Sequence, residues 1–211
     1  ICVGGTVTLS GAGATTYTWT NGVVNNTAFT PTSTNNYTVN GTDGNGCVNT
    51  AQKSVTVNAL PAISATVTNS VICMNGTTSI NASGANTYTI NSSLGNYTSG
   101  VAFSPTATSN YTVSGTSTAN CTSTNNPVVS ITVNPLPIIS ATSANSVICM
   151  NGTTSINGSG ASTYTINSSL GNISNGATFS PTLTTTYTVS GTSTANCTST
   201  NNAVIGITVN P

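Results

Sequence analysis

Apolar and polar residues alternate along short stretches of this chain. Tyr88 and Ile90 alternate with threonines, and the same period of two runs through residues 111–114 and 129–134. Such alternation is typical of a strand with one buried face and one wet face. The stretches are separated by Asn-Gly, Ser-Gly, Gly-Asn and Ser-Pro turn sequences, and helical periodicity is missing. Six or seven short antiparallel strands in about 75 residues predict an all-β fold of the sandwich type.

The pattern repeats along the chain. Residues 71–134 recur as residues 147–210 with 13 differences over 64 aligned positions. Residues 1–58 are a more distant copy that keeps the two cysteines, Pro31 and the strand tyrosines at matching places. A repeat of this length is long enough to form a complete small domain.

We therefore expect three tandem domains, here called repeats one, two and three: residues 1–58, 59–134 and 135–211. Proline-bearing links join them and act as stiff spacers, so the sandwiches are expected to form a rod. Repeats two and three are each preceded by an extra strand, residues 62–69 and 138–145. Repeat one lacks this first strand before Ile1, and Pro211 lies where the next would begin. Either a neighbour supplies the missing strand, as in donor-strand systems, or the protein continues beyond these residues.

Charge is almost absent. Of 211 residues, 45 are Thr, 30 Asn and 29 Ser, and only Asp43 and Lys53 carry a charge; a typical soluble domain is roughly 25% charged. One lysine cannot displace phosphate counterions, which argues against nucleic-acid binding. The lack of His and of carboxylate clusters argues against acid–base catalysis, metal sites and cofactors. No apolar run is long enough for membrane insertion, and we do not expect an enzyme.

Each repeat has two cysteines, without the spacing or the histidines of a zinc site. Disulfides suit so small a domain, because a loop of about 48 residues contributes roughly 4 kcal/mol when it is closed. They also indicate a location outside the cytoplasm. Pairing within each repeat is the first expectation: Cys2–Cys47, Cys73–Cys121 and Cys149–Cys197.

Strand parity tests that pairing. The two cysteines of a repeat share one end of the sandwich only if an even number of strands separates them. With an odd number, neighbouring repeats could pair instead, which would leave one cysteine at each end for an intermolecular link.

Repeat one contains Ile1-Cys2-x-Gly4, Gly11-Ala12-Gly13-Ala14, Tyr17-Thr18-Trp19, Tyr37-Thr38-Val39-x-Gly41-Thr42-Asp43, Gly46-Cys47 and Val55-Thr56-Val57-Asn58. It resembles the Ig-like or PKD-like repeats of large secreted surface proteins of Bacteroidota, which the type IX system commonly exports. The resemblance covers the whole chain three times over. It implies Ig-like sandwiches at the cell surface, used in adhesins, stalks and filaments, with no catalytic residues to transfer.

The aromatic residues are interpreted as structural. Each repeat has a Tyr-Thr-Val strand whose tyrosine is expected in the core or at a corner, with its hydroxyl bound to backbone; ligand stacking is the less favoured alternative. Trp19 is expected in the core of repeat one rather than as a sugar platform. The core or corner aromatics are Tyr17, Trp19, Tyr37, Tyr88, Tyr111, Tyr164 and Tyr187.

The lack of charge also favours association between copies of the chain. Sheet edges are usually protected by charged residues, and a net charge near zero favours association. The leading hypothesis is a subunit or segment of an extracellular filament or sheath, with copies of itself as partners, head to tail or edge to edge. The alternative is a monomeric adhesin stalk that presents a binding tip. The many hydroxyl groups permit O-linked glycans.

Overall fold

The computed structural model describes all residues, 1–211. Its regular elements are twenty β-strands and one short 3-10 helix, so the fold is all-β as predicted. The chain divides into two compact units, which do not coincide with the three repeats. The first comprises residues 1–68, 79–101 and 110–129, and the second residues 69–78, 102–109 and 130–211.

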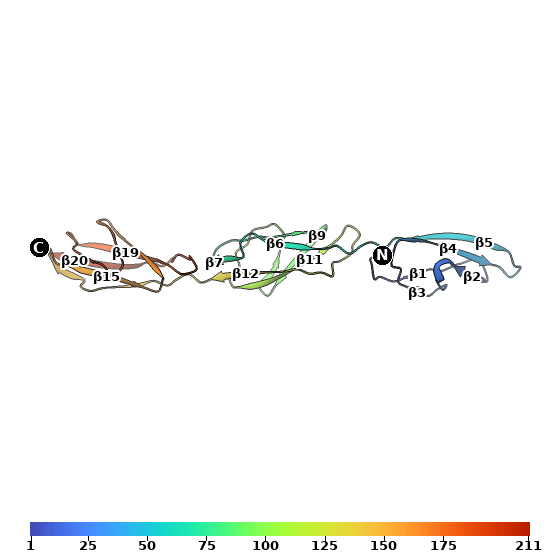
Figure 1. Cartoon of the computed structure of the whole chain (residues 1–211), viewed down its shortest axis with the longest axis horizontal. Coiled ribbons are helices and arrows are strands. Elements are labelled where there is room, and N and C mark those ends of the chain that lie inside the picture. The colour runs from blue at the N-terminus through green and yellow to red at the C-terminus, as the bar shows by residue number, and fades with distance from the viewer. The chain divides into compact units, whose positions relative to one another are not determined.

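Repeat one forms two small sheets. The two-stranded sheet pairs β1 with β3, and the three-stranded sheet has the order β2-β4-β5 (Figure 1). Along β4 the alternation predicted from sequence is visible, because Tyr37 and Val39 are buried whereas Asn36 and Asn40 are exposed. The elements are β1 (Val7–Thr8), β2 (Thr16–Trp19), the 3-10 helix η1 (Thr20–Gly22), β3 (Ala28–Phe29), β4 (Asn35–Thr42) and β5 (Val48–Val55).

Repeat two contains a two-stranded sheet, β6-β8, and a sheet of order β10-β9-β11-β12-β7. The strand that precedes the cysteine, β6, pairs antiparallel with β8 from Ser64↔Ser83 to Val67↔Ile80. The strands are β6 (Ser64–Val67), β7 (Val71–Cys73), β8 (Ile80–Ser83), β9 (Thr87–Ser92), β10 (Gly95–Tyr97), β11 (Ser109–Thr116) and β12 (Val128–Asn134).

Repeat three has the same plan. Its sheets have the orders β13-β15-β18 and β14-β20-β19-β16-β17, so β15 has a neighbour on both sides. The strands are β13 (Ser140–Ser143), β14 (Val147–Cys149), β15 (Thr154–Ser159), β16 (Thr163–Ser168), β17 (Gly171–Ile173), β18 (Thr178–Phe179), β19 (Thr185–Thr192) and β20 (Ala203–Asn210).

One pairing in each repeat is parallel, which the sequence pattern did not indicate. The short strand that carries the first cysteine lies beside the last strand of the same repeat, with Cys73 opposite Asn134 and Cys149 opposite Asn210. In repeat one a single parallel bridge joins Cys2 to Asn58. The other strand pairs are antiparallel, as expected.

The core lies between the two sheets of a repeat. In repeat three it is a cluster of seven buried residues. One of them, Ile139, directly precedes β13. The corresponding cluster of repeat one has five buried residues, and no residue from a preceding strand belongs to it. The two clusters are Ile139, Ile148, Ile156, Ile166, Tyr187, Val189 and Ile207 in repeat three, and Leu9, Trp19, Tyr37, Val39 and Val55 in repeat one.

Candidate functional site: unpaired cysteines and an open groove

Two disulfides link cysteines of neighbouring repeats. Cys2 is bonded to Cys121, and Cys73 is bonded to Cys197, with a Cα–Cα distance of 5.6 Å in both. Both bonds follow one rule: the first cysteine of a repeat joins the second cysteine of the repeat that follows. The expected pairs Cys2–Cys47, Cys73–Cys121 and Cys149–Cys197 are therefore wrong.

The places of the two cysteines along the last strand explain this result. Strand parity does not explain it, because five strands, β15 to β19, lie between Cys149 and Cys197, whereas four strands, β8 to β11, lie between Cys73 and Cys121. Cys149 lies opposite Asn210, at the end of β20, whereas Cys197 follows β19 near the start of β20. Because a strand rises about 3.4 Å per residue, the eight residues of β20 hold the two cysteines roughly 25 Å apart. A disulfide needs Cα atoms closer than about 7 Å.

Cys47 and Cys149 are left as free, exposed thiols. Their backbone surroundings match those of the bonded cysteines at equivalent places. The amide of Cys47 donates to Asp43 Oδ1 at 2.9 Å, and the amides of Cys121 and Cys197 donate in the same way to a serine hydroxyl at 3.2 Å. The backbone amide of Cys47 is thus held in the same way as those of the second cysteines that form disulfides.

Cys149 matches the first cysteines. The amide after it, that of Met150, donates to the carbonyl of Asn210 at 2.8 Å, and the amide of Gly152 donates to the carbonyl of Cys149 at 2.8 Å. The same two hydrogen bonds surround Cys73, also at 2.8 Å. Cys149 therefore has the local geometry of a cysteine that forms a disulfide in this chain.

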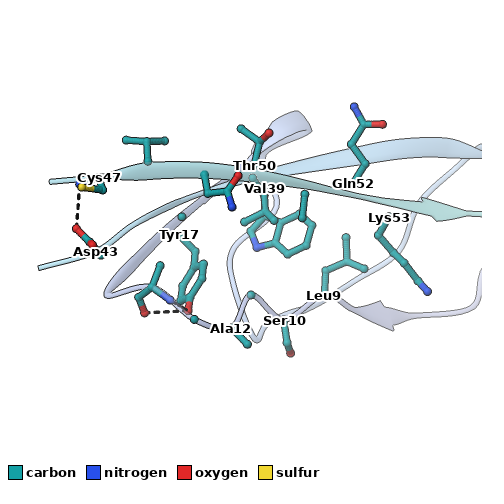
Figure 2. A pocket seen from close by; sticks show the side chains of 18 of the residues that line it. Leu9, Ser10, Ala12, Tyr17, Val39, Asp43, Cys47, Thr50, Gln52 and Lys53 are labelled. Atoms are coloured by element: carbon teal, nitrogen blue, oxygen red, sulfur yellow. Dashed lines mark hydrogen bonds between the residues drawn. The ribbon is translucent and has the colours of Figure 1, made fainter. Parts of the chain in front are cut away.

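An open groove of about 740 Å³ runs along the side of repeat one. Figure 2 shows Leu9, Ser10 and Ala12 on one side of it and the strand that carries Lys53 on the other. Tyr17 and Val39 lie between them, and Trp19 also lines the groove.

The groove lies where repeats two and three have an additional strand. In those repeats a Cβ atom on Gly84 or on Gly160 would overlap the carbonyl of Ala62 or Ile138, two residues before β6 or β13. At the equivalent Gly13 of repeat one, a Cβ atom would meet nothing within 4 Å. Among residues 1–211, nothing fills the place in repeat one that the additional strand fills in the other two repeats.

An isoleucine and an asparagine hold the additional strand in the other repeats. Ile63 is buried and would meet a Cβ atom on Gly115, and Ile139 is placed alike against Gly191. Asn125 accepts the amide hydrogen of Ile63 at 3.1 Å and donates to its carbonyl at 2.8 Å. Repeat one has Ala51 at the fourth residue after its second cysteine, within the unbroken strand β5.

The tyrosines divide into two groups. Those of the Tyr-Thr-Val strands, Tyr37, Tyr111 and Tyr187, are buried, and each ring makes an edge-to-face contact with a neighbouring aromatic ring at about 5 Å. Burial raises the pKa of Tyr111 to about 12, and burial also raises the pKa of Tyr187.

The hydroxyl-to-backbone bond assigned to those tyrosines is made by the other group. Tyr88 Oη donates to the carbonyl of Ala85 at 2.8 Å and accepts its amide hydrogen at 3.0 Å. Tyr17 and Tyr164 make the same two bonds three residues upstream. The signal in the sequence is an Ala three residues before the tyrosine in all three repeats.

The remaining singled-out residues belong to repeat one. Trp19 is buried, and its indole Nε1 donates to Asn25 Oδ1 at 3.0 Å. Both charged side chains line the groove. Asp43 accepts the amides of Asn45 and Cys47, so it closes a turn. Lys53 lies opposite Tyr37 in the β4–β5 pairing, and Figure 2 shows its side chain on the Leu9 side of the strand.

The structure contains no group of three or more His, Cys, Asp or Glu residues placed to hold a metal ion. It also contains no helix that is long and apolar enough to span a membrane.

No protein-family model and no curated protein matches this chain. Among solved structures, it is similar to part of a 1.5-MDa bacterial ice-binding adhesin (15% identity, 83% of this chain and 74% of the other, TM-score 0.35). It is also similar to a Ca²⁺-stabilized adhesin with which an Antarctic bacterium binds ice (14%, 84% and 57%, TM-score 0.40) and to cadherin domains 3–6 of protocadherin gamma B2 (12%, 92% and 65%, TM-score 0.25). These identities and scores carry no argument about binding partners.

Proposed function

We propose that this chain is an extracellular structural protein, and not an enzyme, whose copies assemble into a filament or sheath. Successive copies join through a disulfide between Cys149 of one copy and Cys47 of the next. This junction repeats the rule of the two internal disulfides, in which a first cysteine bonds a second cysteine of the following repeat. The single observation that carries the proposal concerns the two unpaired cysteines. Cys149 is the first cysteine of its repeat, and Cys47 is the second cysteine of its repeat.

The bond forms by thiol–disulfide exchange with a small disulfide oxidant such as oxidised glutathione. The Cys47 thiolate attacks the oxidant, which releases one thiol and leaves a mixed disulfide on Cys47. The Cys149 thiolate of a second copy then displaces the other half of the oxidant as a second thiol. Two protein thiols are oxidised and one small disulfide is reduced to two thiols, so electrons and protons balance.

Low charge supports association between identical surfaces. Only one cation and one anion occur in the side chains of 211 residues, so two copies approach without the electrostatic repulsion that separates most soluble proteins. Bacteroidota as the source and the type IX system as the export route belong to this proposal, on the sequence resemblance. The disulfides support an oxidising, extracellular location.

The test is oxidation of the purified chain by a glutathione redox buffer, followed by non-reducing electrophoresis and negative-stain microscopy. The expected result is a ladder of covalent multimers, regular fibres, and a peptide that contains Cys47 linked to one that contains Cys149. In Cys149→Ser the ladder should stop at a dimer, because only Cys47 can then react. Assembly should persist from low to molar salt.

Two outcomes contradict the proposal. Isolated monomers after complete oxidation, with both thiols capped by glutathione, indicate the alternative of a monomeric adhesin stalk. Fibres that form equally well from a Cys47→Ser, Cys149→Ser chain show that assembly does not use this bond.

A further inference from the structure

We infer that this chain bears tension, and that two separate covalent routes carry the pull between repeats one and three. A covalent route is a path along peptide bonds and one disulfide. The inference goes beyond the proposed function, because it concerns a single copy and applies to a stalk as well as to a filament. Both routes lie between Cys2 and Cys197, so they do not depend on what adjoins residues 1–211.

The first route starts at the second cysteine of repeat one. From Cys47 it follows β5, the link between the repeats, β6 and β7 to Cys73, and the disulfide then leads to Cys197. The route contains residues 48–72, whereas the backbone between the same two ends contains residues 48–196. Because an extended chain spans about 3.5 Å per residue, the route is at most about 90 Å long and the backbone about 520 Å.

The second route starts at the first cysteine of repeat one. From Cys2 the disulfide leads to Cys121, and β12, the next link, β13 and β14 continue to Cys149. The route contains residues 122–148, whereas the backbone between its ends contains residues 3–148. Its greatest length is therefore about 100 Å instead of about 510 Å. The two routes have no residue in common.

Both routes consist largely of chain that is already extended. Strands account for more than half of residues 48–73 and for half of residues 122–149. A strand rises about 3.3–3.4 Å per residue, which is close to the limit of an extended chain, so unfolding adds little length to either route. The segments between the two cysteines of a repeat lie outside both routes and stay slack under tension. They are residues 3–46, 74–120 and 150–196.

The pairing of the cysteines creates the two routes. At each link, both the backbone and a disulfide cross from one repeat to its neighbour. Pairing within each repeat would leave the backbone as the one connection across residues 58–61 and 134–137, so tension would pass through a single chain at each link. The observed pairing doubles the covalent connection at both links.

The disulfides are also shielded. Cys121 and Cys197 are fully buried, and Sγ of Cys121 lies 4.0 Å from the carbonyl oxygen of Asn58, the residue at which the first link begins. Each bond lies inside one compact unit, that of Cys2 in the first and that of Cys73 in the second. Because thiol–disulfide exchange requires access to a sulfur atom, both routes persist while the repeats are folded.

The test stretches the full chain in optical tweezers along two different pulls. The first pull runs from the Cys47 thiol to a tag after Pro211, in a Cys149→Ser chain. The second pull runs from a tag before Ile1 to the Cys149 thiol, in a Cys47→Ser chain. The disulfide of the proposed function cannot form in either chain.

The expected lengths follow from the routes. After all repeats have unfolded, the oxidised chain should reach at most about 140 Å in the first pull and about 100 Å in the second. Reduction of the same tether should raise both lengths above about 500 Å.

Removal of one disulfide should lengthen one pull only. Cys73→Ser with Cys197→Ser should lengthen the first pull about threefold and leave the second unchanged. Cys2→Ser with Cys121→Ser should lengthen the second pull about fourfold and leave the first unchanged. Each pair of variants is therefore the control for the other.

Two insertions form a matched pair that leaves every cysteine in place. Ten Gly-Ser residues between Ala59 and Leu60, on the first route, should lengthen the first pull by about 35 Å and leave the second unchanged. The same insertion between Ser93 and Leu94, in the exposed β9–β10 turn, should change neither pull, because this turn lies outside both routes. Exposed turns accept such insertions, and thermal unfolding confirms that both variants fold.

Three outcomes overturn the inference. The first is an oxidised chain that extends beyond about 200 Å in either pull. The second is a pair of cysteine variants that lengthens both pulls, and the third is a longer pull after insertion in the β9–β10 turn. None of these outcomes depends on whether the chain forms fibres, so the failure of this inference and of the proposed function can be told apart.

Discussion

The side chain of Asn125 binds both backbone groups of Ile63, which lies 62 residues earlier in the chain, with hydrogen bonds of 3.1 and 2.8 Å. Asn201 makes the corresponding pair with Ile139. This contact fixes the residue that precedes the first strand to the connection between β11 and β12 in repeat two, and to the connection between β19 and β20 in repeat three.

Replacing that asparagine should destabilise repeat two. In Asn125→Ala the amide and the carbonyl of Ile63 lose their partners in a half-buried place, which costs roughly 1–3 kcal/mol. Urea unfolding of the full chain measures the change. Thr124→Ala, at the exposed neighbouring position, is the control and should lie within about 0.5 kcal/mol of wild type. Equal stability of the two variants would contradict the role given to the asparagine.

The disulfides should contribute strongly to stability. Each closes a sequence separation of 119 or 124 residues, so replacing one pair, as in Cys2→Ser with Cys121→Ser, should cost roughly 2–5 kcal/mol. Urea midpoints measure this loss. Cys47→Ser leaves both bonds intact and should move the midpoint little. A Cys2–Cys47 peptide in non-reducing mass mapping would refute the pairing itself.

Stability should fall at alkaline pH. The pKa of Tyr111 is raised to about 12 by burial, above the value near 10 of an unfolded chain. The folded state therefore holds this proton more tightly, and its contribution is complete below pH 10 and lost as pH rises from about 10 to 12. A shift of about two pKa units corresponds to roughly 3 kcal/mol.

The variant Tyr111→Phe isolates this effect. Its free energy of unfolding should fall less steeply than that of wild type between pH 10 and 12. A titration followed by tyrosinate absorbance should show one tyrosine with a raised pKa fewer than in wild type. Parallel pH profiles for the two proteins would show that the buried hydroxyl is not responsible.

The turn before the second cysteine should accept either of two side chains. Asp43 accepts the amide of Cys47 in repeat one, and Ser117 accepts that of Cys121 in repeat two. Asp43→Ser should therefore keep wild-type stability, whereas Asp43→Ala should lose about 1 kcal/mol through the unmade hydrogen bonds. Thermal unfolding distinguishes them. A serine variant as unstable as the alanine variant would mean that the carboxylate charge matters.

Period-two alternation was sufficient to predict the all-β fold, because long strands such as β4, β11 and β19 have one face in the core. It was not sufficient for strands such as β18 (Thr178–Phe179), since two residues show no period. The number of strands between two cysteines depends on such short elements. Both pairings therefore stayed open in the sequence, and the expected one was wrong.

The groove was partly predictable. Comparison of the repeats indicated that residues 1–58 contain no equivalent of residues 62–69, but the walls of the groove depend on contacts that the sequence pattern does not encode. The carbonyls of Ala62 and Ile138 cover Gly84 and Gly160, and no residue covers the equivalent Gly13. For the same reason, sequence could identify two tyrosines in each repeat without deciding which one binds the backbone.

The disulfide pattern also sets an order of events while the chain is made. Cys2 must wait until more than a hundred further residues have emerged before Cys121 reaches it. Cys73 of repeat two waits in the same way for Cys197 of repeat three. Disulfide formation therefore follows one repeat behind the growing end, and a chain interrupted between two repeats carries a free first cysteine on its last finished repeat.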